Sequence, residues 1–318
     1  MIGKGGRWLI ILYVAFLTVL FLMCSTDLII REPERKIYQI AVIIEDNRSD
    51  NYSNFRKGMD QAAKEFNVDV HFITLYDKAD SGQQMELMER EQQDGADALI
   101  VVPVDEELVM GKAMTIPVVF LQPKIMENPG DGTILIDYER MGKLLANEMQ
   151  NEIPADCPVW MLTDTAGQSG MDRLFLKGAD AVFSEKGRTV FVTAWDPETV
   201  LRTAMSALGE NEKVVLFAEN PEILTEVSGL LAENPIAAEH VGGLYGRGNT
   251  VPILNSLDSG RISGICVTDD FSIGYLSVRA AVQVLERADS IPVTADIYYI
   301  EKKNLREPDY EKLLFPIE

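Results

Sequence analysis

Short apolar runs alternate with amphipathic stretches along the chain from residue 37 to residue 300. A run of about four to eight apolar residues predicts a buried strand, whereas apolar residues three and four positions apart predict one face of a helix. In the first half of this region the expected elements are, in order, the strand Ile37–Ile44, the helix Tyr52–Phe66, the strand Val68–Leu75, the helix Ser81–Asp94, the strand Ala98–Val102, a short helix through Met114, and the strands Pro117–Leu121 and Gly132–Ile136.

The same alternation starts again near residue 138. The expected elements are the helix Tyr138–Asn151, the strand Val159–Thr163, the helix Met171–Lys186, the strand Val190–Ala194, the helix Thr199–Leu208, the strand Val214–Ala218, the helix Glu222–Asn234, the strand Val241–Leu244, the helix Ile253–Asp258, the strand Ile262–Val267, the helix Ile273–Arg287 and the strand Ala295–Ile300. Alternation without β-hairpin signals is typical of parallel sheets covered by helices on both faces. Two successive rounds therefore predict an α/β fold of two Rossmann-like lobes.

The N-terminal segment has a different pattern. Trp8–Thr26 is a stretch of 19 residues without a charge, preceded by Lys4 and Arg7 and followed by Asp27. As a helix it would reach about 28 Å, close to the thickness of a bilayer's hydrocarbon core. The sequence predicts a single-pass membrane anchor and linker over residues 1–36, with the span at residues 8–26. The rest of the chain is then expected outside the cytoplasm, at the cell surface or in the periplasm.

The end of this segment bears on whether it is retained. A cleaved secretory signal has small residues before the cleavage site, but Val19–Met23 is bulky. Cys24 fits a lipid-modified cysteine, although Met23 stands where lipoprotein signals carry a small residue. A retained anchor is favoured, with a lipidated Cys24 or a cleaved signal as the alternatives.

Composition narrows the range of partners. The net charge is −21, which repels phosphate backbones and argues against a nucleic-acid partner. Outside the apolar segment the chain has only Cys157 and Cys266, and it contains two histidines without CxxC or HExxH spacing. Neither a zinc site nor another cofactor is therefore expected, and Cys266 is interpreted as a small buried apolar residue.

Four segments carry a family resemblance through their order and spacing. They are Ile40–Ile44 with Asn51, Tyr52 and Phe55–Ala63 behind it, then Asp94–Pro103, Ile116–Leu121 and Leu216–Glu222. Together they resemble the sugar-binding type I periplasmic binding proteins. This family includes ribose-binding protein and the effector domains of lac-repressor-type regulators.

The resemblance implies two lobes joined by three hinge strands, with a ligand held in the cleft between them. The chain is expected to cross between lobes near 137–138, 268–269 and 296–298. The N-terminal lobe would comprise residues 37–137 and 268–296, and the C-terminal lobe residues 138–267 and 297–318. Ligands of open α/β sheets bind beyond the carboxyl ends of the strands, which agrees with a cleft site.

Matching positions to the family gives ten candidate ligand-binding residues. They are Asn51, Tyr52, Asp105, Gln122, Arg173, Asn220, Tyr245, Arg247, Thr268 and Asp269. An aromatic ring at 52 can stack on the apolar face of a sugar, and the guanidinium of Arg173 offers a fork of donors to paired hydroxyls. The amide of Asn220 can both donate and accept.

The chain departs from the ribose-type pattern at two positions. Those members carry an Asp-Arg pair where this chain has Gln122-Pro123, and an Asp where it has Tyr245. The loss of charged groups at two positions argues against ribose as the ligand.

The sequence argues against two other classes of protein, a hydrolase and a transcription regulator. The segment Gly167–Gly170 contains Ser169 but is one residue short of the Gly-x-Ser-x-Gly turn of a hydrolase, and no histidine is placed to serve as its base. A transcription regulator would have DNA-reading helices where the apolar segment lies. The sequence thus predicts a non-enzymatic, membrane-tethered solute-binding protein that closes around a small polar ligand, first of all a sugar. The expected partner is an ABC permease, with a sensor histidine kinase as the alternative.

Overall fold

A computed structural model of the chain describes residues 4–25, 36–44, 52–75, 80–123, 132–164, 168–206 and 213–316. The chain divides into two compact units, Met1–Ile37 and Tyr38–Glu318. Each unit is considered by itself.

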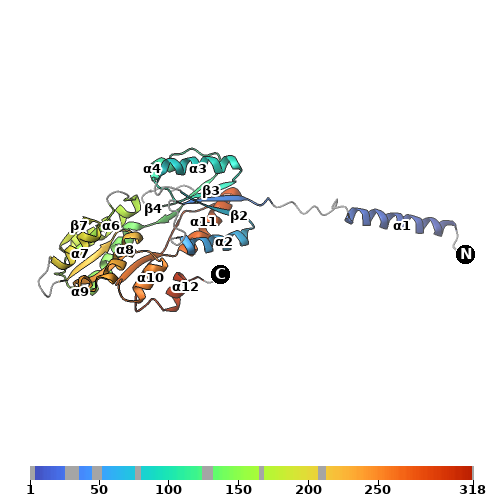
Figure 1. Ribbon diagram of the computed structural model, residues 1–318. Coiled ribbons are helices and arrows are strands. Elements are labelled where there is room, and N and C mark those ends of the chain that lie inside the picture. The colour runs from blue at the N-terminus through green and yellow to red at the C-terminus, as the bar shows by residue number, and fades with distance from the viewer. Residues whose placement is uncertain are drawn as a thin grey trace. The chain divides into compact units, whose positions relative to one another are not determined.

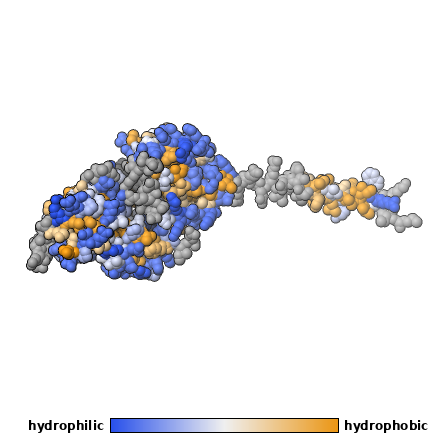
Figure 2. All heavy atoms as spheres, in the orientation of Figure 1, coloured by the Kyte–Doolittle hydropathy of each residue, from blue (hydrophilic) through white to orange (hydrophobic). Residues whose placement is uncertain are grey.

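The first unit contains the helix α1 (Lys4–Ser25). Its stretch Gly5–Met23 is long and apolar enough to cross a membrane, a property that a signal sequence near the N-terminus shares. The apolar side chains of this stretch are exposed, and its visible face is largely hydrophobic in Figure 2. The helix begins four residues before the predicted span, and residue 26 lies outside the described residues.

The first sheet of the second unit has the strand order β11-β5-β4-β3-β1-β2, and every neighbouring pair is parallel. Its strands are β1 (Gln39–Ile44), β2 (Asp69–Thr74), β3 (Ala98–Val101), β4 (Val118–Pro123), β5 (Ile134–Ile136) and β11 (Val293–Thr294). The helices α2 (Ser53–Phe66) and α11 (Asp270–Leu285) bury apolar side chains against one face, and α3 (Ser81–Asp94) and α4 (Glu106–Met110) against the other. We call this sheet with its four helices the first lobe.

The second sheet has the order β12-β10-β9-β8-β6-β7. Its strands are β6 (Val159–Thr163), β7 (Val190–Ala194), β8 (Val214–Ala218), β9 (Val241–Arg247), β10 (Gly264–Thr268) and β12 (Ile297–Glu301). Helices α5 (Tyr138–Glu152) and α6 (Gly170–Glu185) pack on one face. The other face carries α7 (Pro197–Ser206), α8 (Pro221–Glu233), α9 (Pro235–Glu239), α10 (Val251–Asp258) and α12 (Pro308–Leu314). We call this sheet with its helices the second lobe.

The chain passes between the two sheets three times, after β5, after β10 and after β11. Figure 1 shows the result within the second unit: α2, α3 and α11 gather at one end, and α7 and α9 lie at the other. The predicted fold class of two helix-covered, mostly parallel sheets is confirmed.

Four details of the fold differ from the predicted elements. The strand β12 is antiparallel to β10, although only parallel pairs were expected. Alternating patterns identify a strand but not its direction, and β12 enters its sheet directly from the other lobe. The elements β11, with 2 residues, α9, with 5, and α12, with 7, were not predicted, because all three are too short to show a period.

The two helices on one face of the first sheet cross at glycines. A Cβ added to Gly58 of α2 would lie 1.9 Å from the carbonyl oxygen of Phe271, and one added to Gly274 of α11 would lie 2.0 Å from that of Phe55. Only glycine allows the two backbones to approach so closely.

The second lobe repeats this arrangement between α5 and α6. A Cβ on Gly142 would lie 1.9 Å from the carbonyl oxygen of Phe175, and one on Gly178 would lie 2.0 Å from that of Glu139. In both lobes each glycine contacts the residue three positions before the partner glycine. This shared spacing of glycines is a structural repeat between the two lobes.

Candidate functional site

A cavity of about 240 Å³ lies between the two lobes, beyond the carboxyl ends of their strands. This volume has room for several water molecules or a small organic ligand. Five of the predicted residues line it: Tyr52, Gln122, Asn220, Arg247 and Thr268. They come from both lobes, as a ligand that holds the lobes together requires.

Tyr52 stands at the start of α2 and presents an aromatic ring to the cavity. The ring packs edge-on against Phe55, with centroids 5.9 Å apart, and is tilted against Phe72 at 6.2 Å. Phe55 lines the cavity as well. Packing against neighbouring rings fixes the orientation of Tyr52, which suits it for contact with the flat face of a ligand.

Two buried polar atoms at the cavity have no hydrogen-bond partner among the described residues. They are the amide nitrogen Nε2 of Gln122, on β4, and the hydroxyl Oγ1 of Thr250, just before α10. A buried polar atom without a partner costs free energy, and such atoms are rare away from binding sites. A ligand with hydroxyl or carbonyl groups would supply the missing partners.

Asn220 caps a helix through its side-chain oxygen and presents its amide NH₂ group to the cavity. It is the N-cap of α8, and its Oδ1 accepts a hydrogen bond from the backbone N–H of Ile223 at 2.9 Å. The structure records no partner for its Nδ2 in the part of the chain that it describes. The capping bond therefore orients the amide, and the NH₂ group remains as a donor toward the cavity.

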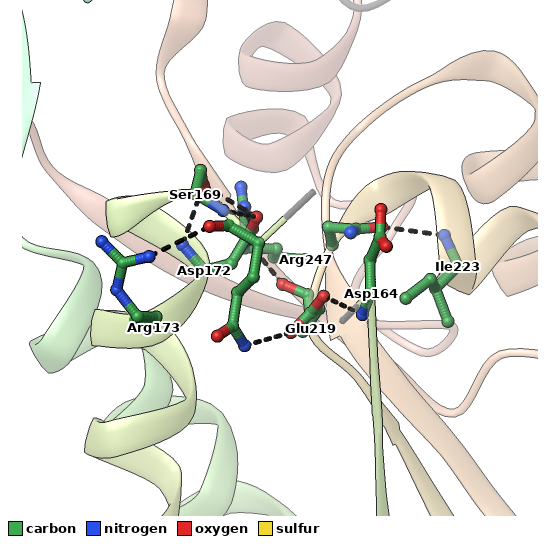
Figure 3. A network of polar contacts seen from close by, with 9 residues as sticks. Asp164, Ser169, Asp172, Arg173, Glu219, Ile223 and Arg247 are labelled. Carbon is green, nitrogen blue, oxygen red and sulfur yellow. Dashed lines mark hydrogen bonds and ion pairs between the residues drawn. The ribbon is translucent and has the colours of Figure 1, made fainter. Parts of the chain in front are cut away.

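Arg247, at the end of β9, is held by acceptors of the second lobe (Figure 3). Its guanidinium forms an ion pair with Asp172 and donates through Nε to the carbonyl oxygen of Glu219 at 3.0 Å. The rings of Tyr138 and Phe175 lie 5.2 and 5.7 Å from its Cζ. The charge of Arg247 is therefore compensated within the protein.

Asp172 and Ser169 form a capping box at the start of α6. The backbone N–H of Asp172 donates to the Ser169 hydroxyl oxygen, while Ser169 donates its N–H and its hydroxyl to Asp172 Oδ2 at 3.1 and 2.7 Å. The serine considered as a nucleophile thus has a capping role. Its hydroxyl lies against a carboxylate that already pairs with Arg247.

Glu219 lies at the end of β8 and is fully buried. Its carboxylate accepts hydrogen bonds from the backbone N–H of Asp164 and from Gln168 Nε2, the latter at 2.8 Å. Burial raises the pKa of the Glu219 carboxyl, and these two donors act in the opposite direction. Through these two hydrogen bonds Glu219 links the end of β8 to the residue after β6 and to the segment before α6.

Asp270 connects the lobes at the rim of the cavity. It stands in the first turn of α11, and its carboxylate accepts hydrogen bonds from Thr268 Oγ1 at 2.6 Å and Asn249 Nδ2 at 2.7 Å. Burial raises the pKa of the Asp270 carboxyl, against the effect of the two donors. A helix of the first lobe is thereby bonded to a loop of the second.

Two predicted residues make only local contacts at helix starts instead of lining the cavity. Asp105 caps α4 by accepting the N–H of Leu108 at 2.9 Å. Asp269 caps α11 through Ser272, whose N–H and hydroxyl donate to it at 2.9 and 2.6 Å. Their carboxylates are occupied by the N-terminal N–H groups that a helix leaves unsatisfied.

Two more predicted residues, Arg173 and Tyr245, do not line the cavity. Arg173 is exposed and donates to the carbonyl oxygen of Gln168 at 3.0 Å, at the margin of the network in Figure 3. Tyr245 is buried in the core of the second lobe, where its hydroxyl donates to Glu152 at 2.8 Å. Burial raises the pKa of Tyr245. The remaining candidate, Asn51, lies outside the described residues.

Several polar residues that line the cavity were not among the ten candidates. They are Ser169, Asp172, Glu222, Asn249, Thr250 and Asp270. Asn249 and Thr250 follow directly on the end of β9, so the rule that ligands bind beyond strand ends points to them. Among the described residues no group of three or more His, Cys, Asp or Glu side chains is arranged to hold a metal ion.

Comparisons with known proteins identify the class of this architecture. A family model described as a periplasmic binding protein domain matches residues 40–289. The chain belongs to this family, and the resemblance seen in the sequence is confirmed. None of the curated proteins matches the sequence.

Solved structures of sugar-binding proteins share the fold. The solute-binding protein of a carbohydrate transporter from Agrobacterium radiobacter, in complex with D-arabinose, has a TM-score of 0.75 at 20% identity and covers 88% of this chain and 100% of its own. The glucose-galactose binding protein GanP from Geobacillus stearothermophilus has a TM-score of 0.69 at 17% identity, with coverage of 86% and 100%. An ABC transporter solute-binding protein from Actinobacillus succinogenes with bound D-allose has a TM-score of 0.69 at 18% identity, with coverage of 84% and 98%.

Proposed function

We propose that this chain is a membrane-tethered, extracytoplasmic solute-binding protein that closes around an uncharged monosaccharide and delivers it to an ABC permease. Closure of the two lobes about their three connections would exclude water from the ligand. No bond of the ligand is made or broken.

One observation carries the proposal: the cavity between the lobes is lined by both of them and contains polar groups that lack partners. Gln122 contributes an unpartnered donor from the first lobe, and Thr250 and Asn220 contribute polar groups from the second. Tyr52 adds an aromatic ring. Hydroxyl groups around a ring with apolar faces match this combination of groups.

The neighbours' titles support the same class of ligand and partner. They name D-arabinose, glucose and galactose, and D-allose as ligands, and a carbohydrate or ABC transporter as the context of two of these proteins. If the chain serves a permease, cells that lack it should take up the radiolabelled sugar more slowly. Unchanged uptake would instead favour the sensor histidine kinase.

A panel of pentoses, hexoses, polyols and amino acids should contain a sugar that stabilises the protein against heat. At 100 times its dissociation constant a ligand adds about 2.7 kcal/mol to the free energy of unfolding. Thermal unfolding of the full chain in detergent measures this shift. No shift with any sugar would contradict the proposal.

The variant Asn220→Asp tests whether the stabilisation by sugar depends on the amide NH₂ group of Asn220. An aspartate keeps the oxygen that caps α8, whereas Asn220→Ala would also remove the cap at a cost of about 1 kcal/mol. Asn220→Asp should therefore unfold near the wild-type temperature without ligand and lose most of the sugar-induced shift. Asp105→Asn, at a cap away from the cavity, is the control and should keep the shift.

The tether is the second part of the proposal. The apolar helix α1 carries the bulky residues Val19–Met23 where a cleaved signal has small residues before its cleavage site, so the segment should be retained in the mature protein. Intact-mass analysis of the protein from washed membranes should give the full sequence. The mass of a chain that begins after the apolar segment would support a cleaved signal instead. The mass of a chain that begins at Cys24 and carries acyl groups would support a lipoprotein.

A further inference from the structure

We propose, on the basis of the proposed function, that the cavity selects an uncharged sugar with an apolar edge, such as a 6-deoxyhexose, over the corresponding fully hydroxylated sugar. The inference comes from the distribution of polar and apolar side chains around the cavity. The first lobe contributes a compact apolar patch, whereas most of the polar side chains come from the second lobe, which also contributes Met141, Met171 and Val267.

The wall of the first lobe is the exposed end of that lobe's hydrophobic core. Val102, Leu121, Phe55 and Ile273 line the cavity and belong to this core, with 6%, 5%, 3% and 3% of their surfaces exposed. Ile136 lines it as well and packs against the same core.

The sheet register places these side chains side by side. Val101 pairs with Phe120 on the neighbouring strand, so Val102 is level with Leu121. Leu121 in turn pairs with Ile134, two residues before Ile136. The three strand ends therefore present one continuous apolar patch, flanked by the amide of Gln122.

A hydroxyl group against this patch would lose its bonds to water without gaining partners. Such a loss weakens binding by at least about tenfold, equivalent to about 1.4 kcal/mol. A methyl group in the same place would strengthen binding by about fourfold over a hydrogen, equivalent to about 0.8 kcal/mol. The first lobe thus favours a methyl over a hydroxymethyl group.

The wall of the second lobe supplies the hydrogen bonds. Asn220, Thr250 and Thr268 bring an amide and two hydroxyls to the opposite side of the cavity. This division orients a ligand with its hydroxylated edge toward the second lobe and its apolar edge toward the first.

The charges at the cavity favour a neutral ligand. Asp172, Glu222 and Asp270 line it, and the one guanidinium there, that of Arg247, already pairs with Asp172 among the described residues. Within the part of the chain that the structure describes, a carboxylate or phosphate on the ligand would face carboxylates without an available cation. This charge distribution disfavours uronic acids and sugar phosphates.

Isothermal titration of the full chain in detergent tests this inference with pairs of sugars that differ at one hydroxyl. The pairs are D-galactose with 6-deoxy-D-galactose, D-glucose with 6-deoxy-D-glucose, and L-mannose with 6-deoxy-L-mannose. L-arabinose tests the loss of the whole C6 group of D-galactose, and D-galacturonate tests the charge. The 6-deoxy member of any pair that binds should bind at least about tenfold tighter.

Two valine variants test whether the apolar wall causes the preference. Val102→Thr replaces a methyl at the cavity by a hydroxyl of nearly the same shape, and should reduce the ratio of affinities within a pair to near one. Val119→Thr makes the same change in the core of the same lobe, away from the cavity, and should leave the ratio unchanged. If threonine at 102 prevents folding, the wild-type ratios alone decide the question.

The outcomes separate this inference from the proposed function. Equal affinities within the pairs, tighter binding of the hydroxylated member or of L-arabinose, or binding of D-galacturonate would overturn the apolar-edge inference and leave a sugar-binding protein. Absence of binding by every sugar here and in the thermal panel would overturn both.

Discussion

Gly58→Ala is expected to lower the free energy of unfolding by about 3 kcal/mol, the upper part of the usual range for overpacking a tight contact. The new Cβ would lie 1.9 Å from the carbonyl oxygen of Phe271, which is backbone and cannot rotate away. Helices α2 and α11 would have to separate, and their apolar contacts with the first sheet would loosen. Chemical unfolding of the full chain in detergent measures the change.

The matched control is Gly229→Ala in α8. Nothing lies within 4 Å of a Cβ at this position, so the substitution should raise stability by about 1 kcal/mol through helix propensity alone. Gly142→Ala, at the equivalent crossing of α5 and α6, should destabilise the second lobe as Gly58→Ala does the first. Wild-type stability of Gly58→Ala would show that the backbones of α2 and α11 are not in contact.

Arg247→Met is expected to cost about 3–5 kcal/mol of stability in the absence of any ligand. The side chain of Asp172 is 8% exposed, and the variant would leave its carboxylate without the guanidinium. The carbonyl oxygen of Glu219 would lose its hydrogen bond from Nε as well. The methionine retains much of the packing against Tyr138 and Phe175. The loss of stability therefore measures mainly the effect of removing the positive charge that pairs with Asp172.

A second variant distinguishes charge from packing. Arg247→Met combined with Asp172→Asn removes the unpaired carboxylate but keeps an oxygen for the capping box, and should recover about 2 kcal/mol of the loss. A double variant no more stable than Arg247→Met would mean that the guanidinium acts through packing and hydrogen bonding alone. The free energies of unfolding of wild type and the single and double variants complete the comparison.

The order of the elements could be read from the sequence because it depends on local patterns. Val214–Ala218 is apolar throughout and fully buried, as expected for a strand covered on both faces. The helix Ser81–Asp94 ends at Gly95, which adopts the left-handed conformation of a C-cap. Two rounds of such elements were enough to predict two lobes, and the restart near residue 138 falls where α5 begins.

The residues that line the cavity were harder to predict, and two of the predicted positions are one residue away from a residue that lines it. Arg173 was expected at the ligand, but its neighbour Asp172 lines the cavity. Asp269 was expected, but Asp270 does so. Successive residues of a helix point about 100° apart, so a shift of one position changes the face completely. At helix starts the choice also depends on which side chain is used as the cap.

Neighbouring residues were enough to predict the apolar N-terminal segment, the two rounds of strands and helices, and the strand ends at which polar residues gather. The tertiary structure decided the antiparallel direction of β12, the glycine crossings and the pairing of Arg247 with Asp172, which are 75 residues apart. It also decided that Tyr245 turns into the core. These features depend on which distant segments meet, and that is fixed only when the lobes pack.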